Sequence, residues 1–555
     1  MRRRIASLIL LSVAAGAAVV AQQHAEQTQM GAKAGITIAA SFDGLGVGFN
    51  GPQGTATLRN PSDNSLAVGP DRVVQIVNSR MAIFDKTGKV LYGPVTTNTL
   101  FKGQGGQCEA RLSGDAVVRY DQLADRWLFV LPLFQRGPVR ADQPALPKGG
   151  DPATFSVPAV AGQPGAAAPL FVPPPPPPPD PNAAPVPPPA RAGQPPAAAR
   201  GQAPPTGPQG PYGMCYAIST SSDPMGSYYR YEFLRPLFPD YPRPAIWTDG
   251  YYVPTSTGDN RISETVATQK HACVVERDKM LKGQPAREQC LIVENVNFLN
   301  NLDIDGKTLP PAGAPNVMLA AGAEQLSGKF EDDGIYAWQL KVDWNDPAKT
   351  KATGPQKLTV APYHYLCDGQ LTKCVPQPGA EIKLDAQGDK IMARVVYRRV
   401  NGNESIVAVH SVNTAAGGGG VRWYEFNVNE KSRALSLKQQ GTYAPEGFYR
   451  WMASPAIDKF GNLGIGYSFG GSPNFAGQRF AGRLAKDPLN QLTLKEVVLV
   501  EGEAAQTSTL RWEDYTQTAV DPVDDCTIWY VGDYFKKDAT SYSTRIGAFR
   551  MPGCK

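Results

Sequence analysis

The chain repeats one short pattern: small or apolar residues end in an aspartate, two to four turn residues follow, and an aromatic or β-branched run comes next. Two apolar runs joined by such a turn are typical of a hairpin between two strands. The aspartates that mark the six copies are Asp71, Asp121, Asp249, Asp385, Asp458 and Asp521. A chain that repeats one hairpin unit must bury the same face in every copy, so it is limited to repeat architectures.

The spacing of these copies predicts how many units the chain holds. Asp71 and Asp121 are 50 residues apart, and Asp458 and Asp521 are 63 residues apart. The interval of 128 residues after Asp121 falls to about 50 without a proline-rich segment, and the 136 residues after Asp249 leave room for one degenerate unit around 317–338. Helical periodicity is almost absent. The sequence therefore predicts an all-β fold, a seven-bladed β-propeller of four-stranded blades, with six or eight blades or a pair of β-sandwiches as alternatives.

Residues 135–212 interrupt this pattern. They hold about half of the 51 prolines, including the run Pro173–Pro179, and offer few apolar side chains to a core. Apolar runs at 127–131 and 214–218 flank the segment and predict two strands of one sheet. We expect a long disordered insertion in an early blade, within a propeller that spans residues 42–554.

The first residues predict export. Arg2–Arg4 precede the apolar run Ile5–Val20, and small residues end the segment at Ala21, as in a signal peptide over residues 1–21; an uncleaved anchor is the alternative. Residues 22–41 are expected to be a flexible segment. No later run is long and apolar enough to span a bilayer. The net charge of +5 argues against a nucleic-acid partner, and the sequence predicts a secreted protein, extracellular or periplasmic, without a transmembrane anchor once the signal is removed.

Eight cysteines in an exported chain favour disulfides. Pairing each cysteine with its neighbour is the simplest proposal, although connectivity does not follow from sequence. A zinc site is the rival, but no C-x-x-C motif occurs. The proposed pairs are Cys108–Cys215, Cys273–Cys290, Cys367–Cys374 and Cys526–Cys554.

Several segments also resemble a known group of proteins. They are Ala67–Asp71, Phe84–Gly88, Arg450–Met452, Arg511–Tyr515, Asp521–Tyr530 and Thr544–Phe549. Together they are similar to secreted bacterial propeller-like proteins of unknown function. The resemblance covers roughly residues 42–554, apart from the proline-rich insertion. It implies export and the propeller fold, and it implies no catalytic residue.

A second set of acids points to a site. Asp63, Asp115, Asp240 and Asp514 each stand six to nine residues before a marker aspartate. In a propeller these positions precede the innermost strands, so the four carboxylates would meet at one mouth of the central channel. Carboxylates in a ring repel one another unless cations compensate, and their oxygens suit Ca²⁺ or Mg²⁺. The alternative is that each aspartate caps its own turn.

Arginine–tryptophan pairs give the ligand-binding candidates. Arg450–Trp451 and Arg511–Trp512 occupy matching points of two units, and Arg111 stands similarly before Asp121. Arginine could bind carboxylate, phosphate or sulfate, and the indole could stack on a sugar. In the alternative, each arginine pairs with a ring aspartate and each tryptophan packs between blades.

Other catalytic patterns are weak. The histidine candidates for acid–base chemistry are His271, His364 and His410, and a glycosidase-like carboxylate pair could come from Glu446, Glu513 and Asp514. No nucleophile elbow, phosphate-binding loop, zinc-protease motif or EF-hand is present.

These observations leave three functions open. The first is a propeller that binds a polysaccharide or protein at one face or in its channel. The second is a metal-assisted hydrolase or lyase that acts on an extracellular polymer through the acid- and arginine-lined mouth. The third is a scaffold that acts through its proline-rich insertion. If the protein is an enzyme, we expect buried acids with perturbed pKa values. If it is a binding module, we expect an exposed aromatic or charged patch.

Overall fold

The computed structural model describes residues 25–137, 139, 155–158, 168–169, 210–235, 238–256, 269–294, 296–326, 330–369 and 373–555. The predicted signal peptide and most of the proline-rich insertion lie outside these residues. Short runs of apolar and β-branched residues, each ended by a turn, build the described part almost entirely from β-strands.

The described residues form seven four-stranded antiparallel units, in chain order. Blade 1 holds β5 (Ser65–Val68), β6 (Arg72–Val77), β7 (Arg80–Asp85) and β8 (Val90–Thr96). Blade 2 holds β9 (Val117–Asp121), β10 (Arg126–Leu133), β13 (Tyr212–Ser219) and β14 (Ser227–Arg235). Blade 3 holds β15 (Ala245–Ile246), β16 (Tyr251–Tyr252), β18 (Gln269–Val275) and β19 (Arg287–Glu294). Blade 4 holds β20 (Asn300–Ile304), β21 (Asn316–Gly322), β22 (Gly334–Lys341) and β23 (Lys351–Leu358).

The remaining blades follow the same plan. Blade 5 holds β26 (Val395–Val400), β27 (Asn403–Asn413), β28 (Gly419–Val428) and β29 (Leu435–Tyr443). Blade 6 holds β30 (Tyr449–Ile457), β31 (Leu463–Gly471), β32 (Asn474–Arg483) and β33 (Leu494–Val500). Blade 7 holds β34 (Gln517–Val520), β35 (Ile528–Tyr534), β36 (Ser543–Arg550) and the N-terminal strand β2 (Thr37–Asp43). Bridging pairs join blades 4, 5 and 6 into one continuous sheet.

Smaller elements fill the connections. They are β1 (Glu26–Gln27), β3 (Asn50–Gly51), β4 (Gly54–Thr55), β11 (Phe155–Pro158), β12 (Ala168–Pro169), β17 (Thr255–Ser256), β24 (Lys373–Gln377), β25 (Ala380–Asp385), α2 (Gly106–Ala110), α3 (Arg277–Met280) and the 3-10 helices η1 (Thr97–Phe101), η2 (Pro347–Lys349) and η3 (Leu366–Asp368). Among the described residues, no helix has both the length and the apolar character needed to cross a membrane.

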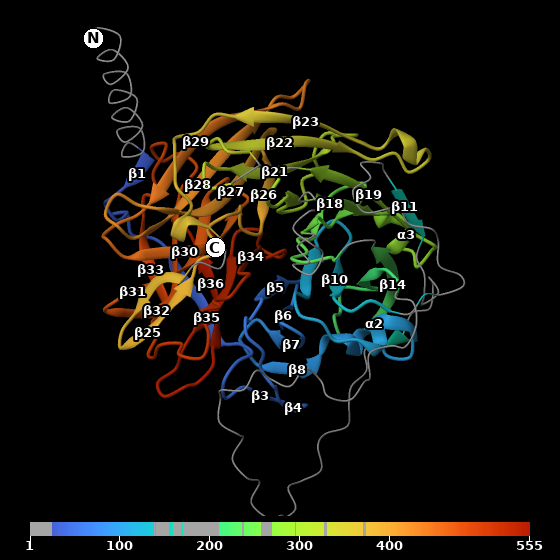
Figure 1. Ribbon diagram of the computed structural model, residues 1–555, viewed down its shortest axis with the longest axis horizontal. Helices are drawn as coiled ribbons and strands as arrows, with labels where there is room; N and C mark the ends of the chain where they lie inside the picture. Colours follow the sequence, from blue (N-terminus) through green and yellow to red (C-terminus); the bar gives the residue numbers. More distant parts are fainter. Residues whose placement is uncertain are drawn as a thin grey trace, which may run out of the picture.

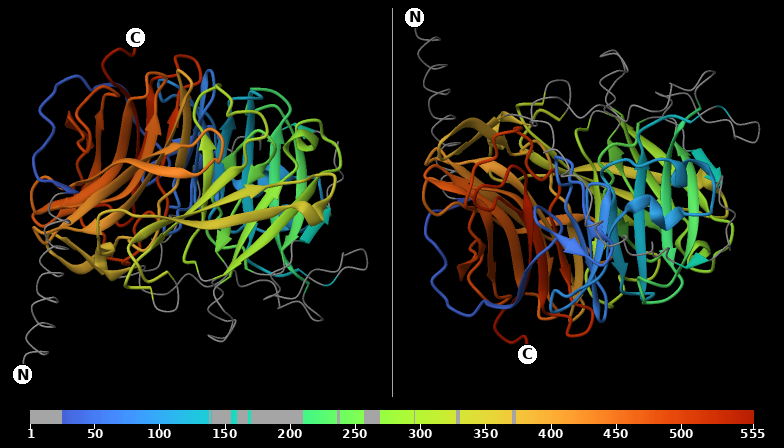
Figure 2. Two further views of the ribbon diagram at one scale, coloured as in Figure 1. Left: turned by 90° about the horizontal axis from the view of Figure 1, so that it is seen from above. Right: turned by 90° about the horizontal axis from the view of Figure 1, so that it is seen from below.

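The innermost strands close a ring around the channel. In chain order β5, β9, β15, β20, β26, β30 and β34 each contact the next, and β34 returns to β5 (Figure 1). Pairing of β2 with β36 completes blade 7 with a strand from the other end of the chain. Figure 2 shows the sheets edge-on, with the C-terminus at one face. The prediction of a seven-bladed propeller is confirmed.

Five of the six marker aspartates lie in hairpins between the first two strands of a blade, as predicted. The sixth prediction was wrong: Asp385 ends β25, in a separate hairpin with β24, and the following strand β26 begins only at Val395. Blade 5 turns instead at Asn401–Gly402, between β26 and β27. This Asn-Gly turn needs no aspartate, because both residues adopt the positive φ that a tight hairpin requires.

The strands on either side of the proline-rich segment are neighbours. β10 pairs antiparallel with β13 from Leu128–Ile218 to Leu133–Gly213, so the segment leaves and re-enters blade 2. Within it, β11 pairs with β19 and β12 pairs with β14. The described part of the segment expected to be flexible, from residue 25, contributes β1 and the first residues of β2, so the boundary expected at residue 42 falls inside a strand.

Four disulfides link the chain, and they are the four neighbour pairs proposed from the sequence. Cys108–Cys215 joins α2 to β13 in blade 2, and Cys273–Cys290 joins β18 to β19 across blade 3. Cys526–Cys554 ties the C-terminal residues to the hairpin that precedes β35.

Candidate functional site

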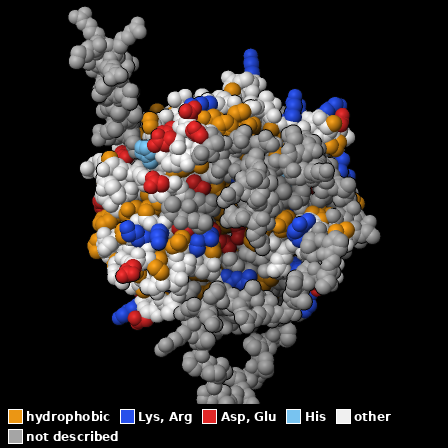
Figure 3. All heavy atoms as spheres, in the orientation of Figure 1, with side chains coloured by type: hydrophobic (Ala, Val, Ile, Leu, Met, Phe, Trp, Pro, Cys, Tyr) orange, Lys and Arg blue, Asp and Glu red, His pale blue; other side chains and the backbone are white. Residues whose placement is uncertain are grey.

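The end of the channel at which the innermost strands begin is called the mouth here. All four predicted acids lie at it: Asp63 precedes β5, Asp115 precedes β9, Asp240 precedes β15 and Asp514 precedes β34. Three of them influence one another, since the charge of Asp115 raises the pKa of Asp63 and that of Asp240 raises the pKa of Asp115. Figure 3, which views the molecule along the channel, shows acidic and basic side chains close together near the centre of the face that it displays.

The backbone at these acids has an uncommon conformation. Asp63, Asp115 and Asp514 have φ values of 47°, 57° and 65°, in the left-handed region. Aspartate tolerates this region better than most residues, and the chain uses it just before each innermost strand starts. Glu513 (φ 59°) and Tyr241 (φ 54°) extend the same feature. Left-handed residues of this kind persist only where the surrounding structure holds them.

Asp115 lies within a frame of tyrosines. The Tyr515 hydroxyl donates to Asp115 Oδ2 at 2.8 Å, and the Tyr241 backbone N–H also faces this carboxylate. The two tyrosine rings stack at 4.2 Å, and the Tyr241 hydroxyl donates to the carbonyl oxygen of Asp514. The Asp115 backbone N–H donates to Asp63 Oδ2 at 3.3 Å. Asp63 and Asp115 are therefore held side by side.

Burial shifts these carboxyls toward their protonated forms. Burial, followed by the charge of Asp240, raises the pKa of Asp115 to about 7. Burial, together with the Asp115 charge, raises the pKa of Asp63 well above its ordinary range. Burial also raises the pKa of Asp240, although Lys270 and Arg511 oppose that shift. The mouth thus holds several carboxyls that keep a proton at pH values where exposed aspartates are ionised.

Arg511 supplies positive charge in the middle of these acids. Its guanidinium pairs with Asp514, and its Nε lies 3.4 Å from Asp385 Oδ2. About a third of its side chain is exposed, so it forms part of the rim. Asp385, which the sequence placed in a blade hairpin, thus belongs to the mouth, where burial raises its pKa to about 7.

Three further cations surround one aromatic ring on the other side of the mouth. Lys390 Nζ, Lys270 Nζ and Arg243 Cζ lie 4.4, 5.0 and 5.1 Å from the centroid of Phe298. Arg243 also stacks on Tyr241 at 4.1 Å. Cations held over aromatic faces gain electrostatic attraction from the ring. Lys390 also pairs with Asp389 at 2.7 Å.

Several buried polar atoms of the mouth make no hydrogen bond. They are Asp63 Oδ1, Asp385 Oδ1 and Oδ2, Arg243 Nε and Nη2, and Arg511 Nε. Buried polar groups in native proteins are nearly always hydrogen-bonded, so such a concentration of unsatisfied donors and acceptors is unusual.

The arrangement differs from the predicted metal site in its source of compensating charge. In the part of the chain that the structure describes, the groups of three or more ligand atoms within 4.8 Å of one another involve the disulfides Cys273–Cys290 and Cys526–Cys554 with Glu288 or Asp524, and none of the mouth acids. The carboxylates at the mouth face Arg511, Lys270 and Lys390 instead. The sequence analysis weighed a bound cation against turn capping by each aspartate, and the structure adds that basic side chains lie among these acids.

The arginine–tryptophan pairs take two different environments. Arg450 is fully buried, with Nε 2.9 Å from Glu496 Oε2, and Trp451 and Trp512 are buried against each other at 6.1 Å between ring centroids. These three side chains do not face solvent, and Arg450 pairs with a glutamate of its own blade, not with a ring aspartate. Arg511 lies at the mouth. Arg111 is half-buried and donates to Gln107 and Gln135 beside α2.

The histidine and glutamate candidates lie elsewhere. His410 is buried and stacks on Tyr424, and burial lowers the pKa of His271 to about 3. His364 is exposed, with Nδ1 2.7 Å from Glu324. Glu446 contacts Arg450 at 3.6 Å, and the carboxylate of Glu513 accepts hydrogen bonds from Gln478 and Ser468.

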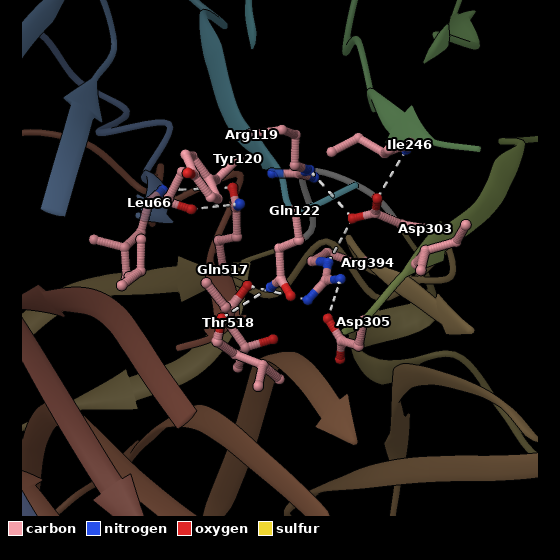
Figure 4. Close-up of a pocket in the computed structure, with 15 residues that line it drawn as sticks. Leu66, Arg119, Tyr120, Gln122, Ile246, Asp303, Asp305, Arg394, Gln517 and Thr518 are labelled. Carbon is pink, nitrogen blue, oxygen red and sulfur yellow. Dashed lines mark hydrogen bonds and ion pairs between the residues drawn. The ribbon is translucent and has the colours of Figure 1, made fainter. Parts of the chain in front are cut away.

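Below the mouth, the channel is filled by a separate ion network (Figure 4). Arg394 pairs with Asp303 at 2.6 Å and with Asp305, and Arg119 Nε lies 3.4 Å from Asp303. Gln517 donates to the Leu66 carbonyl on the neighbouring innermost strand at 2.5 Å. The remaining cavity is about 20 Å³, which is room for one water molecule. A ligand therefore meets the mouth and not an open pore.

Sequence analysis found the acids but missed the basic and aromatic half of the mouth. Lys390 precedes β26 and Phe298 precedes β20, at the places that the predicted acids occupy in other blades. A search for any residue before each innermost strand, instead of for aspartate, would have found both. Lys270 lies in β18, in the second half of blade 3, and no feature of the repeated sequence pattern predicts its place at the mouth.

The known proteins found by comparison are only distantly similar to this chain. No family model matches the chain, and no curated protein matches it. A solved protein of unknown function from Dyadobacter fermentans DSM 18053 is 9% identical, with 93% of this chain and 99% of that chain covered and a TM-score of 0.31. An ulvan lyase of polysaccharide lyase family PL25 is 10% identical over 93% and 95% of the two chains, with a TM-score of 0.34. The NanB sialidase of Streptococcus pneumoniae is 8% identical over 79% and 68%, with a TM-score of 0.35. These TM-scores lie below 0.5, so neither the activity nor the ligand of these proteins transfers to this chain.

Proposed function

We propose that this chain is an exported propeller that binds an extracellular polysaccharide at the mouth of its channel. The observation that carries the proposal is the set of charged side chains there with buried polar atoms that make no hydrogen bond, namely Asp63 Oδ1, both carboxylate oxygens of Asp385, and Nε and Nη2 of Arg243. Elsewhere in the described channel, charged groups of the same types are paired. The unsatisfied atoms therefore mark the place where a ligand would complete the hydrogen bonding.

The chemistry of the mouth suits a polyhydroxylated ligand. Ionised carboxylates accept hydrogen bonds from hydroxyl groups, and arginine donates to hydroxyl, carboxylate or sulfate oxygens. Asp115 and Asp240, both half-buried, and the partly exposed Arg511 form the accessible rim. A sugar chain offers donors and acceptors at every residue, so it can use both kinds of group.

Export fits the covalent structure. Four disulfides are typical of oxidising compartments, and the predicted signal peptide supplies the route. An exported protein meets polysaccharides of cell walls and matrices, which are substrates too large for a closed pocket but accessible to an open mouth. The scaffold function predicted from the sequence depends on the proline-rich insertion, most of which lies outside the described residues.

A binding panel tests this proposal. The full-length mature protein would be measured by affinity electrophoresis against xylan, dextran, alginate and chondroitin sulfate, which cover neutral, carboxylated and sulfated chains. We expect retardation by at least one of them, lost by about tenfold or more in Arg511→Gln, because Arg511 is the cation on the rim.

The matched control is Arg126→Gln. Arg126 is half-buried at the opposite end of β9 and β10, where it donates to the Ala124 and Asp125 carbonyls. Unchanged retardation of this variant locates binding at the mouth. Failure of all four polymers to retard the wild type, or equal loss in both variants, would overturn the proposal.

A further inference from the structure

We propose that the polysaccharide bound at the mouth is acidic, and that Arg59, Arg80 and Arg511 recognise its carboxylate or sulfate groups. This inference rests on the binding function proposed above and names the class of polymer. Arg59 and Arg80 were not among the ligand-binding residues predicted from the sequence.

An arginine stands shortly before the mouth aspartate in blades 7, 1 and 2. The innermost strands of these blades are neighbours in the ring, since β34 contacts β5 and β5 contacts β9. Residues at nearly the same offset before these strands therefore lie along one arc of the rim. The three pairs are Arg511–Asp514, three residues apart, and Arg59–Asp63 and Arg111–Asp115, each four residues apart.

Hydrogen bonds join the arginine-bearing segments of blades 7 and 1. Asn60 Nδ2 donates to Gln506 Oε1 at 2.9 Å, and Gln506 Nε2 donates to the Arg511 carbonyl oxygen at 2.5 Å. The Asp63 backbone N–H donates to the Glu513 carbonyl oxygen at 2.8 Å. The two segments therefore run side by side at the rim.

Arg80 reaches the same part of the rim from the turn between β6 and β7. The Asn78 backbone N–H donates to the Ser62 carbonyl oxygen at 2.6 Å, and the Asn78 side chain donates to the Pro61 carbonyl oxygen at 3.2 Å. These contacts hold the turn against the residues that follow Arg59. The two guanidinium groups also influence each other, because burial and then the charge of Arg59 lower the pKa of Arg80.

Arg59 and Arg80 are accessible cations without an acidic partner. Arg59 is exposed and Arg80 is half-buried, and Arg80 Nη1 donates to the carbonyl and hydroxyl oxygens of Ser79 at 3.2 and 3.1 Å. Within the described ranges neither arginine forms an ion pair with a carboxylate, whereas Arg511 pairs with Asp514. Like charges held together disfavour one another, and an anionic ligand group would relieve that repulsion.

The chemistry of the guanidinium group selects for an anion. Its planar fork of N–H donors matches the oxygens of a carboxylate or sulfate, and bonds of this kind are stronger than those to neutral hydroxyl groups. A neutral sugar offers no charge to set against two arginines. An acidic sugar chain offers one anionic group after another along the rim.

The mouth aspartates oppose this preference only weakly. Asp514 is already paired with Arg511. Asp63 is buried, and its Oδ2 accepts hydrogen bonds from the Asn78 side chain and the Asp115 backbone N–H. The exposed part of this arc is therefore formed by the arginine side chains, with Asp63 beneath the surface.

The experiment measures affinity electrophoresis of the full-length mature protein in xylan, dextran, alginate and dextran sulfate. Dextran and dextran sulfate share a backbone and differ in sulfate, and alginate carries carboxylate alone. The test variant is Arg59→Gln/Arg80→Gln. The matched control is Arg126→Gln/Lys307→Gln, which removes the same charge from the opposite end of the channel, where Lys307 is exposed beside Asp125.

We expect the wild type to bind an acidic polymer about tenfold or more tightly than xylan or dextran, and to bind it less tightly as salt rises. The Arg59→Gln/Arg80→Gln variant should lose about tenfold or more of this affinity, and the control less than about twofold. Arg59→Lys/Arg80→Lys keeps both charges and should retain more affinity than the glutamine variant. Tighter binding to alginate would assign carboxylate as the recognised group, and tighter binding to dextran sulfate would assign sulfate.

Three results would overturn the inference and leave the binding proposal standing, because binding at the mouth is tested separately by Arg511→Gln. They are equal affinity for neutral and acidic polymers, equal loss in the test and control variants, and equal loss in the lysine and glutamine variants. A wild type that binds none of the polymers would overturn both proposals.

Discussion

The channel interior and the mouth contain the same residue types in opposite states. In the interior, every carboxylate oxygen of Asp303 and Asp305 accepts a hydrogen bond, from Arg394 or from the Ile246 and Ile457 backbone N–H groups. At the mouth, Asp63 Oδ1 and both carboxylate oxygens of Asp385 accept none. The two sets lie at different depths along the same channel.

This difference separates a structural ion network from a candidate site. A buried ion pair with all of its hydrogen bonds made fixes the relation between blades, here between blades 2, 4 and 5. A buried charge without partners reduces stability and is retained where a ligand or proton completes it. Asp63 and Asp385 are as buried as Asp303 and Asp305, so hydrogen-bond satisfaction is the property that distinguishes these carboxylates.

The largest effect is expected from breaking the interior network. Asp303→Asn removes the charge that Arg394 and Arg119 share, and leaves two buried guanidinium groups against a neutral amide. We expect a loss of about 3–5 kcal/mol in the free energy of unfolding, measured by urea denaturation. A loss below about 1 kcal/mol would show that the charged groups of the interior are no better hydrogen-bonded than those of the mouth.

The second effect is a pH dependence that belongs to the mouth. Asp115 has a pKa of about 7 in the folded protein, against about 3.9 for an unfolded chain. Between these values the folded state holds a proton that the unfolded state lacks, so raising the pH from 5 to 8 lowers the free energy of unfolding. Asp115→Asn should lose about 2 kcal/mol less over this range than the wild type. Parallel curves for the two proteins, from urea denaturation at each pH, would contradict the assignment.

A smaller effect is expected from Arg511→Gln, which removes the cation that the mouth acids share. At pH 8 we expect a loss of about 1–2 kcal/mol in the free energy of unfolding, because the carboxylates then repel one another uncompensated. At pH 5.5 the loss should be smaller, since protonated Asp115 and Asp385 no longer need compensation. Thermal unfolding at the two pH values measures this, and a loss independent of pH would be inconsistent with a role among the acids.

The smallest effect is expected from divalent cations. Ca²⁺ or Mg²⁺ bound at 100 times its dissociation constant would stabilise the fold by about 2.7 kcal/mol. Because Arg511, Lys270 and Lys390 already face the carboxylates, we expect added Ca²⁺ or EDTA to change the stability by less than about 0.5 kcal/mol. A larger shift that disappears in an Asp115→Ala/Asp514→Ala variant would restore the metal-assisted function predicted from the sequence.

The fold was more accessible from the sequence than the site. Hairpin periodicity is a local property, so the sequence around turns such as Asp71 and Asp121 predicts the blades directly. Pairing each cysteine with its neighbour, the simplest proposal, gave the four disulfides. The prediction that Asp385 marks a blade hairpin was wrong because an aspartate after an apolar run also ends a hairpin outside the blades.

The site depends on contacts between blades, which no local pattern contains. Arg450 and Arg511 stand in the same dipeptide, yet Arg450 meets Glu496 of its own blade and becomes buried, whereas Arg511 reaches the acids of other blades. The acids were predictable because they repeat at one offset from the hairpins. Lys270 and Arg243 were not, because each comes from a different position in its unit.

Infrared difference spectroscopy of the carboxyl groups between pH 5.5 and pH 8.5 tests the central distinction most directly. The account predicts a protonated-carboxyl band in the wild type that titrates near pH 7, becomes weaker in Asp115→Asn and is unchanged in Asp125→Asn. Spectra in which Asp115→Asn leaves the band as it is in the wild type, or in which no carboxyl titrates above pH 5.5, would contradict it and make the mouth a structural network like the interior.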